Sequence, residues 1–237
     1  MVVSNPMARI SRIVVPNYPY HIVQRGNNKQ RVFFDDEDRE RYLQLIRWYT
    51  KKWKCSVFAY SLMPNHIHLL VKPSKDIGLA KTMQGIGLCH TQSINRKYRR
   101  TGRLWECRYY SCIVNEDAYL WSVIRYIDWN SVRAGLAKEP QVYRWSSARA
   151  HILGVEDPLL SLGELPGYEN TDEYRDFIQK RGTQKEIDRI RRVTRKGLPL
   201  GDQTFVREVE MKTNRNLMGK NRGRPRKTKH FKNGMCP

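Results

Sequence analysis

The amino-acid sequence predicts an α+β fold in which helices pack on a central antiparallel sheet. Apolar residues recur at helical spacing in some segments and alternate in others, so helices and strands follow one another along the first two-thirds of the chain. Pro64-Asn65 joins two strand-like segments by a turn too short for a parallel crossover, which indicates an antiparallel hairpin.

The predicted elements follow the order strand, helix, strand, strand, helix, strand, helix, which is typical of the ferredoxin-like arrangement. Asp35 and Asp36 begin the first helix, and Asn115-Glu116-Asp117 cap the third. The expected strands are 19–25, 55–62, 66–73 and 104–114, and the expected helices are 35–52, 76–98 and 116–134.

The remaining third of the chain predicts a small, basic helical extension. Thr183-Gln184-Lys185-Glu186 fits a capping box, and Gly197 fits the end of the same helix. We expect short helices near 171–181, 183–196 and 203–212. The predicted organisation is a main domain at 7–150, a helical C-terminal extension at 151–218 and a basic, disordered tail at 219–237.

The net charge predicts a polyanionic partner. The 237 residues hold 44 Lys and Arg against 23 Asp and Glu, and residues 181–237 alone hold 17 against 5. Nucleic acid is the usual partner of so basic a protein. The apolar runs are too short to span a bilayer, and the five cysteines lack zinc-ribbon spacing, so we expect a cytoplasmic protein without membrane contacts or a structural zinc.

Two histidines lie at the head of an apolar strand, in Met63-Pro64-Asn65-His66-Ile67-His68. Side chains alternate faces along a strand, so His66 and His68 point the same way, close enough to share one metal ion. Ile67 then points into the core. An isolated His-x-His pair is weak evidence, and His21 on the first strand is a competing candidate that we interpret as structural.

The helix predicted at 116–134 supplies groups suited to a phosphodiester. Tyr119, Tyr126, Asn130 and Arg133 share one flank. Tyr126 is the preferred nucleophile because Asn130 follows it by one helical turn, whereas Val123, which cannot bind a metal, follows Tyr119. Two imidazoles and an amide oxygen suit Mg²⁺ or Mn²⁺. The phenol, with an ordinary pKa of about 10, also needs a nearby positive charge or a base.

Together these residues resemble the HUH single-tyrosine transposases, and most closely the REP-associated tyrosine transposases (RAYTs). The resemblance covers residues 7 to about 150. The motifs that carry it are Tyr20-His21-Ile22-Val23-Gln24-Arg25-Gly26-Asn27-Asn28, Met63-Pro64-Asn65-His66-Ile67-His68, Gly102-Arg103-Leu104-Trp105-Glu106, Arg125-Tyr126-Ile127-Asp128-Trp129-Asn130-Ser131-Val132-Arg133-Ala134-Gly135 and Trp145-Ser146-Ser147.

The resemblance implies a ferredoxin-like HUH domain that nicks and rejoins single-stranded DNA at hairpin-forming palindromes repeated in bacterial genomes. It implies that His66, His68 and Asn130 bind a divalent metal. It also implies that Tyr126 forms a 5′-phosphotyrosine link and leaves a free 3′-hydroxyl. Ser131 stands where the family usually has proline and Cys107 where glycine is common. Neither touches the proposed ligands, although Ser131 removes a helix stop and the helix can end elsewhere.

Further basic and aromatic residues are expected to contact DNA. Arg103, Arg108 and Arg133 are the candidates in the main domain, and Trp105, Tyr109 and Tyr110 could stack on exposed bases. The tail residues Arg222, Arg224, Arg226 and Lys227 resemble an AT-hook that would lie in an A·T-rich minor groove; a basic tail binding any nucleic acid explains them equally well.

Two other functions remain open at this point. A domesticated relative could recognise repeated palindromes without cutting, although such a protein would not need all four chemical residues. An RNA-binding sheet would need paired aromatic residues on its central strands, where His66 and His68 lie instead. We expect a nucleoid-associated monomer rather than a dimer that exchanges catalytic helices.

Overall fold

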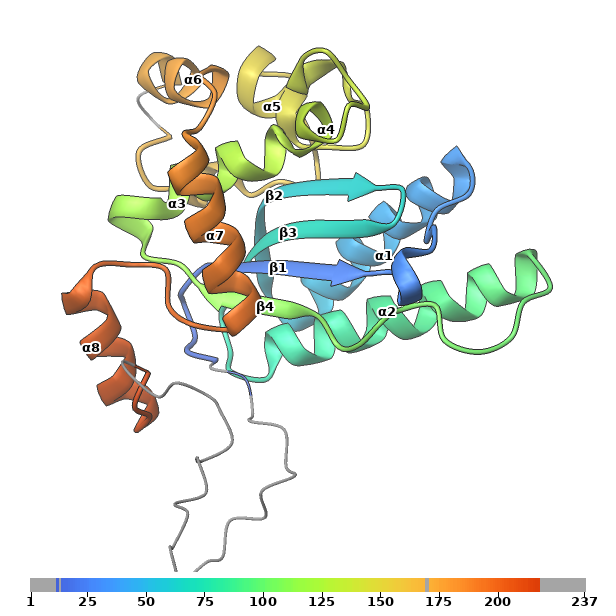
Figure 1. The fold of residues 1–237 in the computed structure, drawn as a ribbon, viewed down its shortest axis with the longest axis horizontal. Helices are drawn as coiled ribbons and strands as arrows, with labels where there is room; N and C mark the ends of the chain where they lie inside the picture. Colours follow the sequence, from blue (N-terminus) through green and yellow to red (C-terminus); the bar gives the residue numbers. More distant parts are fainter. Residues whose placement is uncertain (1–11, 13, 169–170, 218–237) are drawn as a thin grey trace, which may run out of the picture.

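The computed structural model describes residue 12, residues 14–168 and residues 171–217. Its centre is a four-stranded antiparallel sheet in the order β2-β3-β1-β4 (Figure 1). The strands are β1 (Tyr20–Arg25), β2 (Cys55–Met63), β3 (His66–Pro73) and β4 (Tyr110–Ile113). Helices cover both faces of the sheet, so the predicted α+β class is confirmed.

Strand β3 lies at the centre of the sheet and carries both histidines. The Pro64-Asn65 turn joins it to β2, with Met63 opposite His66. On its other side β1 pairs antiparallel, so that Val23 lies opposite His68. Ile67 and Leu69 are fully buried on the face opposite the histidines. The alternation of the strand therefore places both imidazoles on one face of the sheet.

Helices α1 (Asp36–Trp53) and α2 (Gly78–Lys97) cover the face that receives Ile67 and Leu69 (Figure 1). Asp35 caps α1 through a capping box with Asp38. None of the helices in the described part of the chain combines the length and apolar character that a membrane span requires.

The histidine face is covered mainly by α3 (Glu116–Asp128) and α7 (Gln184–Lys196), which pack on β2 and β4 respectively. The remaining elements are α4 (Asn130–Arg133), α5 (Ala148–Leu153), α6 (Thr171–Gln179), α8 (Gln203–Thr213) and the 3₁₀ segments η1 (Asn27–Lys29), η2 (Pro140–Val142) and η3 (Leu162–Glu164).

Helix α7 begins and ends where the sequence predicts. Thr183 Oγ1 accepts a hydrogen bond from the Glu186 amide at 3.3 Å, and the Glu186 carboxylate accepts one from the Thr183 amide at 2.8 Å. Gly197 ends the helix with φ 67°, a conformation that suits glycine. Ile187, Ile190 and Val193 are buried against the domain. The predicted C-terminal extension therefore packs directly against the sheet.

Two predicted elements differ from the structure. The helix expected at 116–134 is interrupted at Trp129, where ψ is 2° and the indole donates a hydrogen bond to the Ile178 carbonyl at 2.8 Å. The strand expected at 104–114 is regular only at 110–113. Trp105 instead packs toward α2, where its indole donates to the Gly87 carbonyl at 3.3 Å.

Candidate active site

A cavity of about 700 Å³ opens on the histidine face of the sheet. Strands β1, β3 and β4, helices α3 and α4, and helix α7 all contribute to its wall. Its lining residues are His21, Val23, Arg25, Lys29, His66, His68, Glu106, Tyr110, Tyr126, Asn130, Arg133, Ala134, Arg191, Thr194 and Arg195. The four residues proposed for chemistry therefore share one cavity, with five cationic side chains around them.

The two strand histidines lie side by side, with ring centroids 5.1 Å apart. His66 Nδ1 lies 2.6 Å from Asn65 Oδ1, an oxygen that only accepts, so Nδ1 carries the proton of the neutral ring. The lone pair of His66 is therefore on Nε2, which lies 3.3 Å from the Asn130 side-chain amide. The turn residue before the strand thus fixes the tautomer that a metal ligand needs.

His68 belongs to a buried chain of hydrogen bonds that reaches across the sheet into α7. His68 Nδ1 lies 3.0 Å from His21 Nε2, and His21 Nδ1 lies 2.8 Å from Thr194 Oγ1. Thr194 Oγ1 lies 3.2 Å from Cys112 Sγ. All four side chains are at most 3% exposed.

The direction of this chain decides what His68 offers to the cavity. If His68 Nδ1 donates to His21, then His21 donates to Thr194 and the Thr194 hydroxyl donates to Cys112. His68 Nε2 then carries a lone pair. In the opposite direction His68 Nε2 carries the proton and cannot bind a metal. Both directions satisfy every group along the chain, and a metal-binding His68 requires the first. In either direction His21 lies behind His68 and contacts it within hydrogen-bond distance.

All three imidazoles favour the neutral form. Burial lowers the pKa of His21 to about 3 and that of His66 to about 4, and it holds the pKa of His68 well below its ordinary range. The positive charges of Arg25 and Arg133 act in the same direction. Neutral imidazoles at pH 7 are the form that binds a metal ion.

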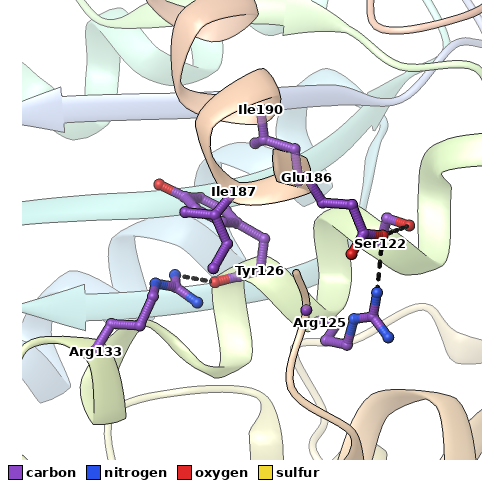
Figure 2. A pocket seen from close by; sticks show the side chains of 8 residues that line it. Ser122, Arg125, Tyr126, Arg133, Glu186, Ile187 and Ile190 are labelled. Atoms are coloured by element: carbon purple, nitrogen blue, oxygen red, sulfur yellow. Dashed lines mark hydrogen bonds and ion pairs between the residues drawn. The ribbon is translucent and has the colours of Figure 1, made fainter. Parts of the chain in front are cut away.

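Tyr126 lies on α3 against these rings and is 7% exposed. Its ring meets those of His21 and His68 edge-on, at centroid distances of 5.5 and 5.6 Å. Ile187 and Ile190 of α7 cover its other side (Figure 2). The phenol thus lies between the histidine pair and α7, on the wall of the cavity.

Arg133 supplies positive charge beside this phenol. Its guanidinium carbon lies 4.4 Å from the centroid of the Tyr126 ring, and its Nη2 donates a hydrogen bond to the Tyr126 carbonyl (Figure 2). Burial lowers the pKa of Arg133 to about 10, and interaction with the Tyr126 side chain opposes that shift. Of the two ways to activate the phenol that the sequence left open, a neighbouring charge is thus present.

The end of α3 is fixed by a buried network that the sequence did not predict. Asp128 is fully buried, and its carboxylate lies 2.7 Å from Ser147 Oγ and 2.6 Å from His151 Nδ1. Arg125 pairs with Glu186 of α7 at 2.9 Å (Figure 2). Asp128 lies between Tyr126 and Asn130 in sequence, so this network sets the position of both.

Two imidazole nitrogens and one amide oxygen would form a mixed donor set for a divalent cation. His66 Nε2, His68 Nε2 and the Asn130 side-chain oxygen are neutral nitrogen and oxygen donors around one cavity. No group of three or more His, Cys, Asp or Glu side chains among the described residues is arranged to hold a metal. A three-ligand site in this cavity would therefore need the Asn130 amide beside the two histidines. Rotating the Asn130 amide would present its oxygen to His66.

The predicted DNA-contacting residues fall into three groups. Arg133 lines the cavity, whereas Arg103 and Arg108 are exposed outside its wall. Arg222, Arg224, Arg226 and Lys227 lie outside the described residues, as does the tail that contains them.

Among the aromatic residues, Tyr110 lines the cavity, whereas Trp105 and Tyr109 are buried in the core. Neither Trp105 nor Tyr109 is therefore placed to stack on a base inside the cavity, in contrast to the prediction. Arg25, Arg191 and Arg195 also line the cavity and were not predicted, because nothing in their local sequence pattern shows that they reach it.

The fold and the cavity define an α+β domain that presents a helix tyrosine to a pair of strand histidines. Residues 14–130 match the family model described as transposase IS200-like. This part of the chain, just under half of its length, is therefore similar to IS200-like transposases, and the resemblance recognised from the sequence motifs is confirmed. A search of curated proteins gave no match.

The solved structures that the chain matches include two transposases. A REP-associated tyrosine transposase bound to a REP hairpin is 14% identical, with a TM-score of 0.54 over 65% of this chain and 92% of that one. A putative transposase from Deinococcus radiodurans R1 is 18% identical, with a TM-score of 0.36 over 50% of this chain and 93% of that one. The first similarity shows a shared fold.

Proposed function

We propose that this transposase nicks single-stranded DNA at hairpin-forming repeated palindromes and transfers the strand through a 5′-phosphotyrosine on Tyr126. The observation that carries the proposal is that Tyr126, His66, His68 and Asn130 line one cavity, although 60 residues separate the strand from the helix tyrosine in the numbering. The sequence resemblance to RAYTs supports the same assignment.

In the proposed reaction the Tyr126 phenol loses its proton and its oxygen forms a bond to the phosphorus of a phosphodiester. The bond from phosphorus to the 3′ oxygen breaks, and that oxygen takes up a proton to become a 3′-hydroxyl. One phosphodiester replaces another, so the reverse reaction on a new 3′-hydroxyl needs no ATP. Arg133 stabilises the phenolate and the charge that develops on the phosphate.

His66, His68 and Asn130 would hold Mg²⁺ or Mn²⁺ in this cavity. When bound, such a cation neutralises phosphate charge and helps to orient the group that is attacked. The protein's own part is to keep both imidazoles neutral, to fix the His66 tautomer through Asn65, and to hold Tyr126 against the histidines.

A DNA hairpin is the proposed partner. The net charge of +21 favours a polyanion, and the REP-associated transposase with the same fold is described as bound to a REP hairpin. We propose that the chain acts as a monomer near the nucleoid and that the basic tail adds contacts to A·T-rich duplex.

The direct test is the Tyr126→Phe variant, with Tyr119→Phe as its matched control. Both tyrosines lie on α3, but Tyr119 lies outside the cavity, where Arg189 stacks on its ring at 4.6 Å. On a panel of genomic hairpins in Mg²⁺ or Mn²⁺, Tyr126→Phe should bind but not cut, whereas Tyr119→Phe should cut. Cleavage by Tyr126→Phe would show that the nucleophile is wrong.

Binding without any nicking by the intact chain in either metal would favour the alternative of a DNA-binding protein that has lost catalysis. The presence of all four chemical residues in one cavity argues against that alternative, since palindrome binding alone does not require them.

A further inference from the structure

The outer face of α7 carries a basic surface next to the active-site cavity. Arg191, Arg192, Arg195 and Lys196 line a second hollow of about 580 Å³, together with Asp188. Arg191 and Arg195 also line the cavity that contains Tyr126. The two hollows are therefore joined along a boundary formed by these two arginines, and we call the second one the α7 groove.

The positive charge of the α7 groove is largely uncompensated. All four cationic side chains are exposed. Among the described residues, Asp188 is the one carboxylate on the groove wall, and it approaches Arg191 at 3.8 Å, a surface contact worth little. Arg191 also lowers the pKa of Arg133, as expected where cations gather with few anions.

Helix capping explains only part of this charge. Cations in the last turn of a helix interact favourably with its dipole, which accounts for Arg195 and Lys196. Arg191 and Arg192 lie one turn earlier, where that effect is weak. The four residues form two pairs at i, i+4 spacing, so both pairs line up along the outward face of α7.

The opposite face of α7 holds this surface in place. Ile187, Ile190 and Val193 are buried against the domain, the capping box fixes the start of the helix, and Gly197 fixes its end. The α7 groove is thus a surface set on a rigid element, outside residues 14–130 that match the family model.

We propose that the α7 groove binds the sugar-phosphate backbone of the single-stranded DNA that continues from the cleaved phosphate. This inference rests on the proposed function, because it assumes that the scissile phosphate enters the cavity with Tyr126. A strand leaving that cavity past Arg191 and Arg195 enters the α7 groove directly. Flexible cations without neighbouring base-reading groups suit a backbone of any sequence.

The test uses the full chain with Tyr126→Phe as background, so that no DNA is cut. The double variant Arg192→Ala/Lys196→Ala removes the two cations that line only the α7 groove. Its matched control is Lys51→Ala/Lys52→Ala, which removes the same charge from exposed positions on α1, on the other side of the sheet. The probes are a fluorescent 12-nucleotide oligothymidine and a blunt-ended stem-loop, followed by anisotropy at several salt concentrations.

For single-stranded DNA, each cation that no longer pairs with a phosphate reduces the slope of log K against log salt by about 0.7, so the double variant should reduce it by about 1.4. That corresponds to about 25-fold weaker binding of oligothymidine at 0.1 M salt. The stem-loop and the α1 control should change much less. Equal weakening in the control, an unchanged salt slope, or weakening confined to the stem-loop would overturn the proposal.

The outcome is separable from that of the proposed function. Cleavage by Tyr126→Phe would exclude Tyr126 as the nucleophile but would not change the result for DNA binding by the α7 groove. Normal nicking by the intact chain, together with unchanged oligothymidine binding by the α7 variant, would refute only the role of the α7 groove. Thermal unfolding of each variant, at midpoints equal to that of the parent, excludes loss of folding as the cause.

Discussion

Replacing Thr194 with valine tests whether α7 orients the ligand atom of His68. The substitution keeps the size of the side chain and removes the hydroxyl that lies 2.8 Å from His21 Nδ1. His21 is fully buried, so its Nδ1–H then lacks a partner, at a cost of about 1–3 kcal/mol. The ring can avoid this cost by moving its proton to Nε2. His21 Nε2 then donates a hydrogen bond to His68 Nδ1, so the proton of His68 must lie on its Nε2.

Only the proton shift weakens metal binding, because an unpartnered Nδ1–H costs the metal-free and metal-bound protein equally, whereas a shifted proton must be moved back before His68 can bind the metal. The same 1–3 kcal/mol corresponds to an affinity for Mn²⁺ about 5- to 150-fold lower, in the range expected when a metal ligand is deprived of its hydrogen-bond partner. Isothermal titration of the full chain with Mn²⁺ measures it. Thr194→Ser, which keeps the hydroxyl, should bind nearly as the parent does. Imidazole ¹⁵N shifts report the tautomer of His68. Parent-like Mn²⁺ affinity in Thr194→Val would refute the reasoning.

Three further predictions concern stability, measured by urea unfolding. Asp128→Ala should lower the free energy of unfolding by about 2 kcal/mol, because it removes the buried partner of His151 Nδ1 and leaves Ser147 Oγ with the Tyr60 carbonyl alone; no measurable decrease would contradict this. Gly87→Ala should stabilise α2 by up to about 1 kcal/mol, whereas Gly85→Ala should destabilise it because the new Cβ would overlap the Tyr49 ring; equal effects would count against that packing. Burial lowers the pKa of His90 to about 4, so between pH 6.5 and 4 the unfolded chain binds one more proton at this residue. His90 should therefore contribute about 3 kcal/mol to the fall in stability as pH falls through that window, in addition to the contributions of the active-site histidines, and His90→Gln should lack this share.

The local features of the fold could be predicted because their causes are local. Alternation alone places His66 and His68 on one face of β3, and a two-residue turn requires the hairpin before them. The capping box at Thr183 and the glycine at 197 determine both ends of α7 within a few residues of sequence. The same applies to the cap that Asp35 provides for α1.

The parts that could not be predicted depend on contacts between distant segments. Thr194 lies 173 residues from His21, and no local pattern relates them. Trp129 interrupts its helix because its indole reaches a carbonyl of α6, a partner 49 residues away. Trp105 likewise turns inward, because α2 offers it an acceptor and a packing surface. The candidate ligands were therefore recognisable from motifs, whereas the groups that orient them were not.

The most direct measurement is the identity of the residue that becomes linked to DNA. The intact chain would be incubated in Mn²⁺ with a hairpin that it cleaves. The protein would then be digested, and the peptide that carries the DNA adduct would be sequenced by mass spectrometry. We predict a 5′-phosphotyrosine on Tyr126. An adduct on Tyr110, which lines the same cavity, or on any other residue would contradict this mechanism, as would cleavage that leaves no covalent adduct.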